Sequence, residues 1–105
     1  MKIKDLKKTR KRRIDSIIGK IIDKKPVYIR TKSLIKARLE DDTGAITLNL
    51  WGRQKDDCEL GDVVRVKNAF TKRHLGIFEL HTWDDIEVIK SSDKIIDKHK
   101  LNELN

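Results

Sequence analysis

The sequence has one cysteine, Cys58, and one proline, Pro26, among its 105 residues. A lone cysteine cannot form an internal disulfide, so the chain is no disulfide-stapled scaffold and gives no sign of an oxidising compartment. No run approaches the ~18 apolar residues of a membrane-spanning helix, and the residues after Met1 do not resemble a signal peptide. These absences predict a cytoplasmic protein with no membrane association.

Residues that catalyse reactions or bind metals are also scarce. One cysteine and three dispersed histidines do not provide the paired spacing of a zinc site. No glycine-rich loop is followed by Lys-Ser/Thr, and no serine or cysteine lies near a base. Three acidic pairs fall at expected turns, where aspartate bonds nearby backbone N–H groups: Asp41-Asp42, Asp56-Asp57 and Asp84-Asp85. We therefore expect no enzyme, no metal and no cofactor.

Charge is abundant but unevenly distributed. The formal net charge is +8, and residues 1–13 alone contain eight Lys/Arg and one Asp, whereas the chain from Ile14 onward sums to +1. A basic segment on a nearly neutral body indicates a polyanionic partner. The same segment fits a solvated terminus that aids solubility, so charge alone does not identify the partner.

Apolar and polar residues alternate through the middle of the chain, as is typical of half-buried strands. We expect strands at residues 13–22, 34–40, 45–51, 62–70 and 77–82, with 86–89 extending the last. The segment DKKPVYIRTKS is expected to be a loop because Pro26 interrupts a strand ladder. DDTG is expected to be a tight turn in which Gly44 supplies a positive φ.

The number and spacing of these strands favour an all-β fold. Residues 53–60 predict a short helical turn between the third and fourth strands, and Ile96, Leu101 and Leu104 have helix-like spacing near the C-terminus. Because a sandwich usually needs about seven strands, we expect a five-stranded barrel of the OB type. The expected parts are a basic N-terminal arm (1–13), the barrel (14–90) and a polar, partly helical tail (91–105).

The segments LEDDTGAITLNLWGRQ and LGDVVRVKNAF resemble OB-fold single-stranded-DNA-binding proteins of archaea and eukaryotes, the replication protein A type. The opening IKDL also resembles the Ile-x-Asp-Leu entry of that family. The resemblance covers about residues 3–89 and is most specific over 39–70. It implies a barrel that binds a single strand across strands 2 and 3, with roles in replication and DNA repair.

Trp51 is the largest apolar side chain on the polar parity of its strand, and it occupies the family's Leu-Trp position. Exposed rings stack unpaired bases at roughly 1–3 kcal/mol per base, so Trp51 is predicted to stack rather than to pack under the following turn. Phe70 stacks a second base if a bulge at Asn68-Ala69 turns it outward. His74 lies where relatives carry another ring, which implies a weaker or pH-sensitive contact.

Polar and basic residues are predicted to complete the binding face. Lys and Arg neutralise phosphates, while Asn and Thr hydrogen-bond bases or sugars. The predicted phosphate or polar contacts are Lys36, Arg38, Asn49, Lys72 and Arg73, with Tyr28, Arg30, Thr47, His81 and Trp83 as additional candidates. Ordinary surface charge is the competing interpretation for the basic residues, and a structural role for Tyr28 and Trp83.

The sequence thus predicts a protein that binds single-stranded DNA with little sequence preference. Two alternatives stay open. An RNA-binding OB domain, associated with tRNA or the ribosome, would use the same stacking chemistry and differ in contacts to the 2′-hydroxyl. An OB-fold interaction subunit of a replication or repair complex would use residues 91–105 for docking or self-association.

Overall fold

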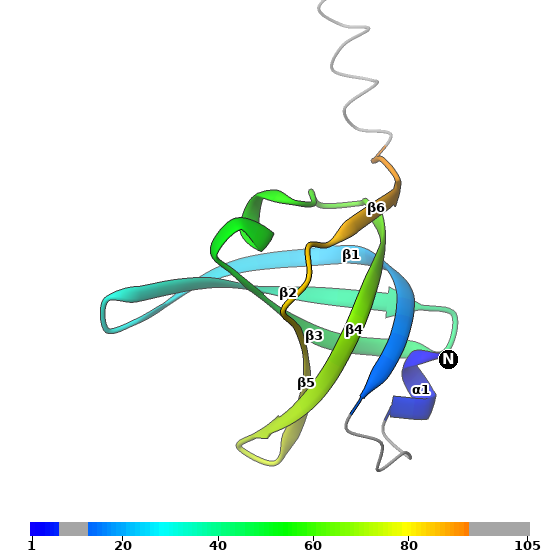
Figure 1. Ribbon diagram of the computed structural model, residues 1–105, viewed down its shortest axis with the longest axis horizontal. Coiled ribbons are helices and arrows are strands. Elements are labelled where there is room, and N and C mark those ends of the chain that lie inside the picture. The colour runs from blue at the N-terminus through cyan, green and yellow to red at the C-terminus, as the bar shows by residue number, and fades with distance from the viewer. Residues whose placement is uncertain (7–12, 93–105) are drawn as a thin grey trace, which may run out of the picture.

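The computed structural model describes residues 1–6 and 13–92 (Figure 1). Its elements are α1 (Ile3–Leu6), β1 (Ile14–Ile29), β2 (Lys32–Asp41), β3 (Gly44–Trp51), the 3-10 helix η1 (Gly52–Asp56), β4 (Val63–His74), β5 (Ile77–Thr82) and β6 (Glu87–Lys90). The sheet runs in the order β1-β2-β3-β5-β4, and β4 pairs back with β1 to close a five-stranded barrel. The predicted all-β barrel and its helical turn after the third strand are confirmed.

Alternation along the strands builds the core. Ile46, Leu48 and Leu50 of β3 point inward with at most 3% of their surface exposed, as their shared parity predicts. The same cluster includes Val64 and Val66 of β4 and Leu80 of β5. Burial of such side chains contributes about 1.5–3 kcal/mol each, so this continuous apolar interior holds the barrel closed.

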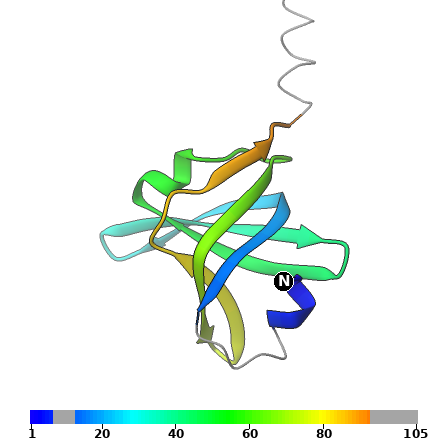
Figure 2. The same cartoon turned by 45° about the vertical axis from the view of Figure 1, so that its right-hand side comes forward.

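The N-terminal turn covers one end of the barrel, beside the β2–β3 turn (Figure 2). Ile3 and Leu6 of α1 are buried in the same cluster as the strand residues. The first residues of the predicted N-terminal arm therefore belong to the folded domain. Residues 7–12 of that arm and residues 93–105 of the predicted tail lie outside the described part of the chain.

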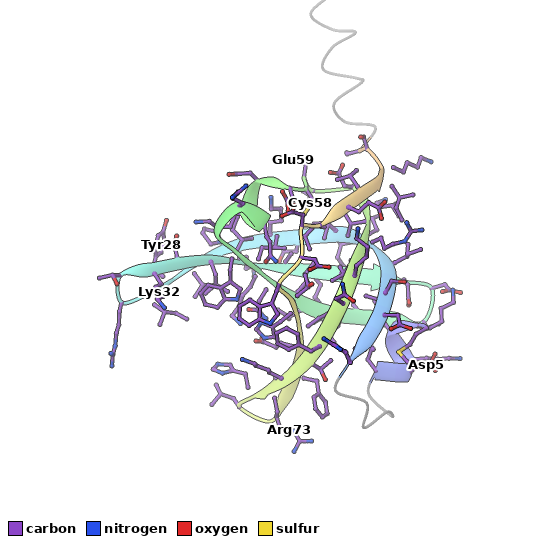
Figure 3. All side chains as sticks on the ribbon, in the orientation of Figure 1. Asp5, Tyr28, Lys32, Cys58, Glu59 and Arg73 are labelled. Carbon is purple, nitrogen blue, oxygen red and sulfur yellow. The ribbon has the colours of Figure 1, made fainter. Side chains whose placement is uncertain are left out.

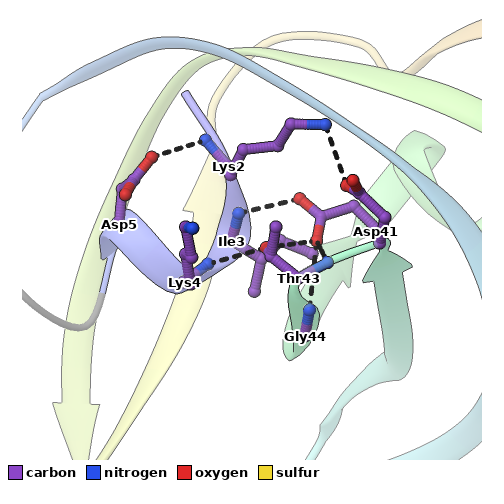
Figure 4. Close-up of polar contacts among 8 residues, drawn as sticks. Lys2, Ile3, Lys4, Asp5, Asp41, Thr43 and Gly44 are labelled. Carbon is purple, nitrogen blue, oxygen red and sulfur yellow. Dashed lines mark hydrogen bonds and ion pairs between the residues drawn. The ribbon is translucent and has the colours of Figure 1, made fainter.

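Asp41 joins α1 to the β2–β3 turn (Figure 4). Its carboxylate accepts the backbone N–H of Ile3 at 2.8 Å, and those of Thr43 and Gly44 at 2.7 and 3.1 Å. The positive φ predicted for Gly44 is wrong, because this glycine is not in the left-handed region. The Asp41 side chain satisfies the turn's donors instead, so glycine's conformational freedom is not needed.

Asp41→Ala is expected to reduce the free energy of unfolding by about 2 kcal/mol at pH 7, because a carboxylate that accepts several N–H groups is lost. Burial acts to raise the pKa of Asp41, but its hydrogen bonds outweigh burial and hold the pKa below the ordinary 3.8. The stabilisation is therefore present above pH 3.8 and lost as the pH falls through the lower, folded-state pKa.

Urea unfolding at pH 7 and pH 3 measures this contribution. Asp42→Ala is the matched control, because Asp42 lies in the same turn and forms an exposed salt bridge with Lys2; the change should cost less than ~0.5 kcal/mol. Equal losses for the two variants at pH 7, or a wild-type advantage that does not shrink at pH 3, would contradict the assignment.

The loop expected around Pro26 is instead strand. β1 runs through Pro26 to Ile29 and pairs with β2 down to Ile29↔Lys32, so only Arg30 and Thr31 form the turn. The pairing of β1 with β4 ends at Lys20. Beyond that point β1 has β2 on one side only, which is where a strand tolerates proline. The result is a long hairpin that projects from the barrel (Figure 1).

β4 also exceeds its predicted length, whereas β5 (Ile77–Thr82) has the bounds predicted for it. The expected loop at 71–76 is strand as far as His74, followed by a turn with Leu75 and Gly76 at positive φ. Residues 86–89 do not extend β5; β6 pairs antiparallel with β4 beyond the closed barrel. No helix among the described residues is long and apolar enough to cross a membrane.

β4 changes its inward parity at Asn68, which has a φ of 49°. Val64 and Val66 face the core, but the next inward side chain is Ala69. β1 pairs with β4 in constant register across this point, from Ile17↔Val66 to Ile14↔Ala69, so the irregularity is a kink without an inserted residue. Phe70 is therefore turned outward, as the stacking hypothesis requires, although by a kink rather than a bulge.

Candidate nucleic-acid interface

Four rings lie around one cavity of about 340 Å³ on the outside of the barrel: those of Trp51, Phe70, His81 and Trp83. Trp51 ends β3 and is 38% exposed, while Trp83 follows β5 and is 84% exposed. Lys32, Lys72 and Thr82 complete the walls. We call this cavity the aromatic groove. Its rings come from three separate predicted segments, so the fold brings together side chains that the sequence only suggested one by one.

Strand register explains the ring contacts. Phe70 pairs directly with His81 across β4 and β5, and their rings stack at 5.5 Å between centroids with an interplanar angle of 13°. The ring of Trp83 lies 5.8 Å from Phe70 at 31°. Its exposure shows that Trp83 is not a core plug. Each ring therefore restricts its neighbour, which lowers the entropy cost of holding flat surfaces ready for a ligand.

Basic side chains stand beside the rings. The Nζ of Lys72 lies 5.6 Å from the centre of the Phe70 ring, and the Arg73 guanidinium lies 4.7 Å from that of Phe78. Figure 3 places Arg73 on the β4–β5 hairpin and Lys32 with Tyr28 at the β1–β2 hairpin. Tyr28 is exposed, so the structure does not give it a core role. Cations therefore flank the aromatic groove on both hairpins.

The side chains of two predicted contact residues already have partners within the protein. Lys36 forms a salt bridge with Glu79 at 2.9 Å and donates to the Asn49 side-chain oxygen at 3.0 Å. Asn49 also donates to Glu79 at 3.3 Å and is only 1% exposed. The prediction that Asn49 is available at the surface is wrong, because its side chain is buried and hydrogen-bonded to Lys36 and Glu79. We expect Lys36 and Asn49 to support the groove rather than to hold phosphate.

The protonation of this network follows from its contacts. Burial acts to raise the pKa of Glu79, but hydrogen bonds from Lys36 and Asn49 outweigh burial and lower it below its usual value. Burial lowers the pKa of His81, and the charge of Lys72 lowers it further. The Glu79 carboxylate is therefore ionised and the His81 imidazole neutral near pH 7, which suits stacking on Phe70.

Other predicted residues do not line the aromatic groove. Arg38 is exposed on β2 and donates to Thr47 at 3.3 Å. His74 ends β4 and is exposed, but it is not among the residues that line the aromatic groove. Arg30 occupies the β1–β2 turn with a φ of 55°. None of these three residues lines the aromatic groove, and their contacts to a ligand stay predictions.

Gln54 of η1, which sequence analysis missed, connects the two tryptophan segments. Its Oε1 accepts the backbone N–H of Trp51 at 3.0 Å. Its Nε2 donates to the carbonyls of Thr82 and Asp84, on either side of Trp83, at 2.7 and 2.8 Å. Gln54 is 7% exposed. An amide has one acceptor oxygen and two N–H donors, so this single side chain holds the backbone at Trp51 and on both sides of Trp83.

The described residues contain no group of three or more His, Cys, Asp or Glu that could hold a metal ion. Cys58 is buried, and burial raises the pKa of its thiol to about 11. The thiol is therefore protonated at neutral pH and poorly nucleophilic.

A closed five-stranded barrel with strand order β1-β2-β3-β5-β4 and a short helical turn after β3 defines an OB domain. The chain belongs to the OB-domain family: it superimposes on the OB domain of Ta0387 from Thermoplasma acidophilum with a TM-score of 0.65 and 31% identity, over 85% of each chain.

A second similarity is to the single-stranded DNA binding protein Ssb of Saccharolobus solfataricus, with 27% identity over 62 residues. The matched region is 59% of this chain and 42% of that relative, so the chain spans less than half of the relative's length. No protein-family model matches the sequence.

Proposed function

We propose that this protein binds single-stranded nucleic acid, with DNA favoured over RNA, and that it is a binding protein of the replication protein A type rather than an enzyme. The observation that carries the proposal is the aromatic groove, in which four rings and two lysines line one open cavity. The similarity to a single-stranded DNA binding protein supports it.

The groove suits unpaired bases because rings contact the flat faces of bases, which a duplex hides in its stack. Trp51 and Phe70 offer faces for stacking, and every base has such a face, so little sequence preference is expected there. Lys32 and Lys72 line the same cavity and provide charge for the phosphates between stacked bases. Arg73 on the β4–β5 hairpin extends that charge beyond the rings.

A tryptophan-fluorescence titration tests the proposal. Oligo-dT of about 12 nucleotides, oligo-U and duplex DNA are added at about 50 and 200 mM salt. Oligo-dT should quench strongly, oligo-U less and duplex least. Affinity should fall with salt, because each neutralised phosphate on a single strand adds roughly 0.7 to the logarithmic slope. Lys36 should add little, because Glu79 already neutralises it.

Two results would redirect the assignment. Tighter binding of oligo-U would move the ligand class to RNA, for which the same rings serve and the 2′-hydroxyl makes the difference. Absence of quenching by either single strand at the lower salt, with the protein shown to be folded by circular dichroism, would reject nucleic-acid binding and favour the protein-interaction alternative.

A further inference from the structure

Trp83 lines a second cavity besides the aromatic groove. This second cavity, of about 580 Å³, is lined by Arg13, Asn68, Phe70, Trp83 and Asp84. Phe70 and Trp83 are common to both cavities, whereas their remaining walls differ completely. Trp83 therefore contributes to the walls of both cavities. We call the second cavity the Arg13 cavity; its size falls within the ~300–1,000 Å³ of small-ligand sites.

We propose that the Arg13 cavity is a nucleotide subsite that selects guanine, an inference that rests on the proposed function. A strand that leaves the aromatic groove past Trp83 would enter this cavity, where the next base stacks on Trp83 or Phe70 and Arg13 meets its phosphate. The subsite would add a sequence preference to a groove that otherwise stacks any base.

The polar groups of the Arg13 cavity carry the specificity. Asn68 donates its Nδ2–H to the Oδ2 of Asp84 at 2.6 Å. The backbone of Asp84 is held from both sides, since its N–H bonds the Thr82 hydroxyl at 3.1 Å and its carbonyl accepts from Gln54 at 2.8 Å. The carboxylate is therefore oriented before a ligand arrives, which is a condition for selective recognition.

A carboxylate accepts hydrogen bonds and cannot donate them. Guanine presents two adjacent donors, N1–H and the N2 amino group, on its Watson–Crick edge, and a carboxylate can accept both at once in a charge-assisted pair. Adenine and cytosine offer only an amino group beside an acceptor that the carboxylate repels. Thymine offers one N–H between two carbonyl oxygens. The preference should therefore be guanine first and thymine last.

Fluorescence titrations with oligo-dT and with the same oligonucleotide carrying one central dG test the proposal. Wild type should bind the dG strand roughly tenfold tighter than oligo-dT, as expected for one bidentate base contact. Substituting dI for dG, which removes only the N2 amino group, should abolish most of that advantage without altering the protein.

Asp84→Asn should reduce the dG preference to within about twofold while oligo-dT affinity is retained, because asparagine keeps an acceptor for Asn68 but not the paired oxygens. Asp85→Asn, at the exposed neighbouring position, is the control and should retain the preference. Equal binding of dG, dI and dT strands by wild type would overturn the subsite and leave the proposed function standing. Failure of oligo-dT itself to bind would overturn both.

Discussion

Replacing both Trp51 and Phe70 with alanine is expected to weaken oligo-dT binding by about 100-fold or more. Each stacked base contributes roughly 1–3 kcal/mol, and 1.4 kcal/mol corresponds to a factor of ten. Phe70 also contacts the rings of His81 and Trp83, so its removal loosens two further surfaces. Each single variant should lose about tenfold. Fluorescence anisotropy of a labelled oligonucleotide measures the affinities without depending on the protein's own tryptophans.

Ile89→Ala is the matched control for this pair. Ile89 is an exposed apolar residue of β6, a strand that contributes no residue to the aromatic groove. Its substitution should leave affinity within about twofold, as expected for a surface position away from the site. If the double variant binds as tightly as the Ile89 control, the rings do not stack bases and the aromatic groove is not the binding site.

Gln54→Leu is expected to reduce the free energy of unfolding by about 3 kcal/mol. Leucine fills a similar volume but leaves the N–H of Trp51 and the carbonyls of Thr82 and Asp84 without their partner, and buried groups left unsatisfied cost about 1–3 kcal/mol each. Affinity for oligo-dT should also fall about tenfold, because the backbone on both sides of Trp83 loses its anchor. Urea unfolding and anisotropy measure the two effects separately.

Arg53→Ala provides the control in the same short helix. Arg53 is exposed and precedes Gln54, so its replacement tests whether any change in η1 destabilises the fold. It should cost less than ~0.5 kcal/mol. A double-mutant cycle that combines Gln54→Leu with Trp83→Ala separates positioning from general damage. If the two affinity losses simply add, Gln54 does not act through Trp83.

The barrel could be predicted from the sequence because its core follows a local rule. Ile46, Leu48 and Leu50 alternate in the chain and are buried in the structure, and period-2 patterning requires no knowledge of other strands. Pro26 was misleading because its effect depends on a distant fact, namely that β4 no longer pairs with β1 at that point. The predicted strand lengths were wrong where the length depends on pairing with another strand rather than on the local sequence pattern.

The sequence singled out Trp51 and Phe70 of the candidate site, but it also singled out His74, which does not line the groove, and it did not show the polar contacts. Trp51 stands out by its size and its parity, and the resemblance to the family points to Phe70. Lys36 and Glu79 are 43 residues apart, and only the parallel contact of β3 with β5 brings their region together. Gln54 carries no sequence signal beyond its place in a short polar turn after Trp51. Such contacts depend on which strands lie side by side, and the local sequence pattern does not show this.

The kink at Asn68 determines which of two adjacent side chains faces the core and which faces solvent. Ala69 is fully buried and Phe70 lies outside, and a regular strand would reverse them. Reversal would force the Phe70 ring into the space that the Ala69 methyl group fills. The small interior volume therefore favours the left-handed conformation at Asn68, which asparagine tolerates better than most residues. A substitution at position 68 that favours a regular strand would therefore put at risk both the ring that faces solvent and the packing behind it.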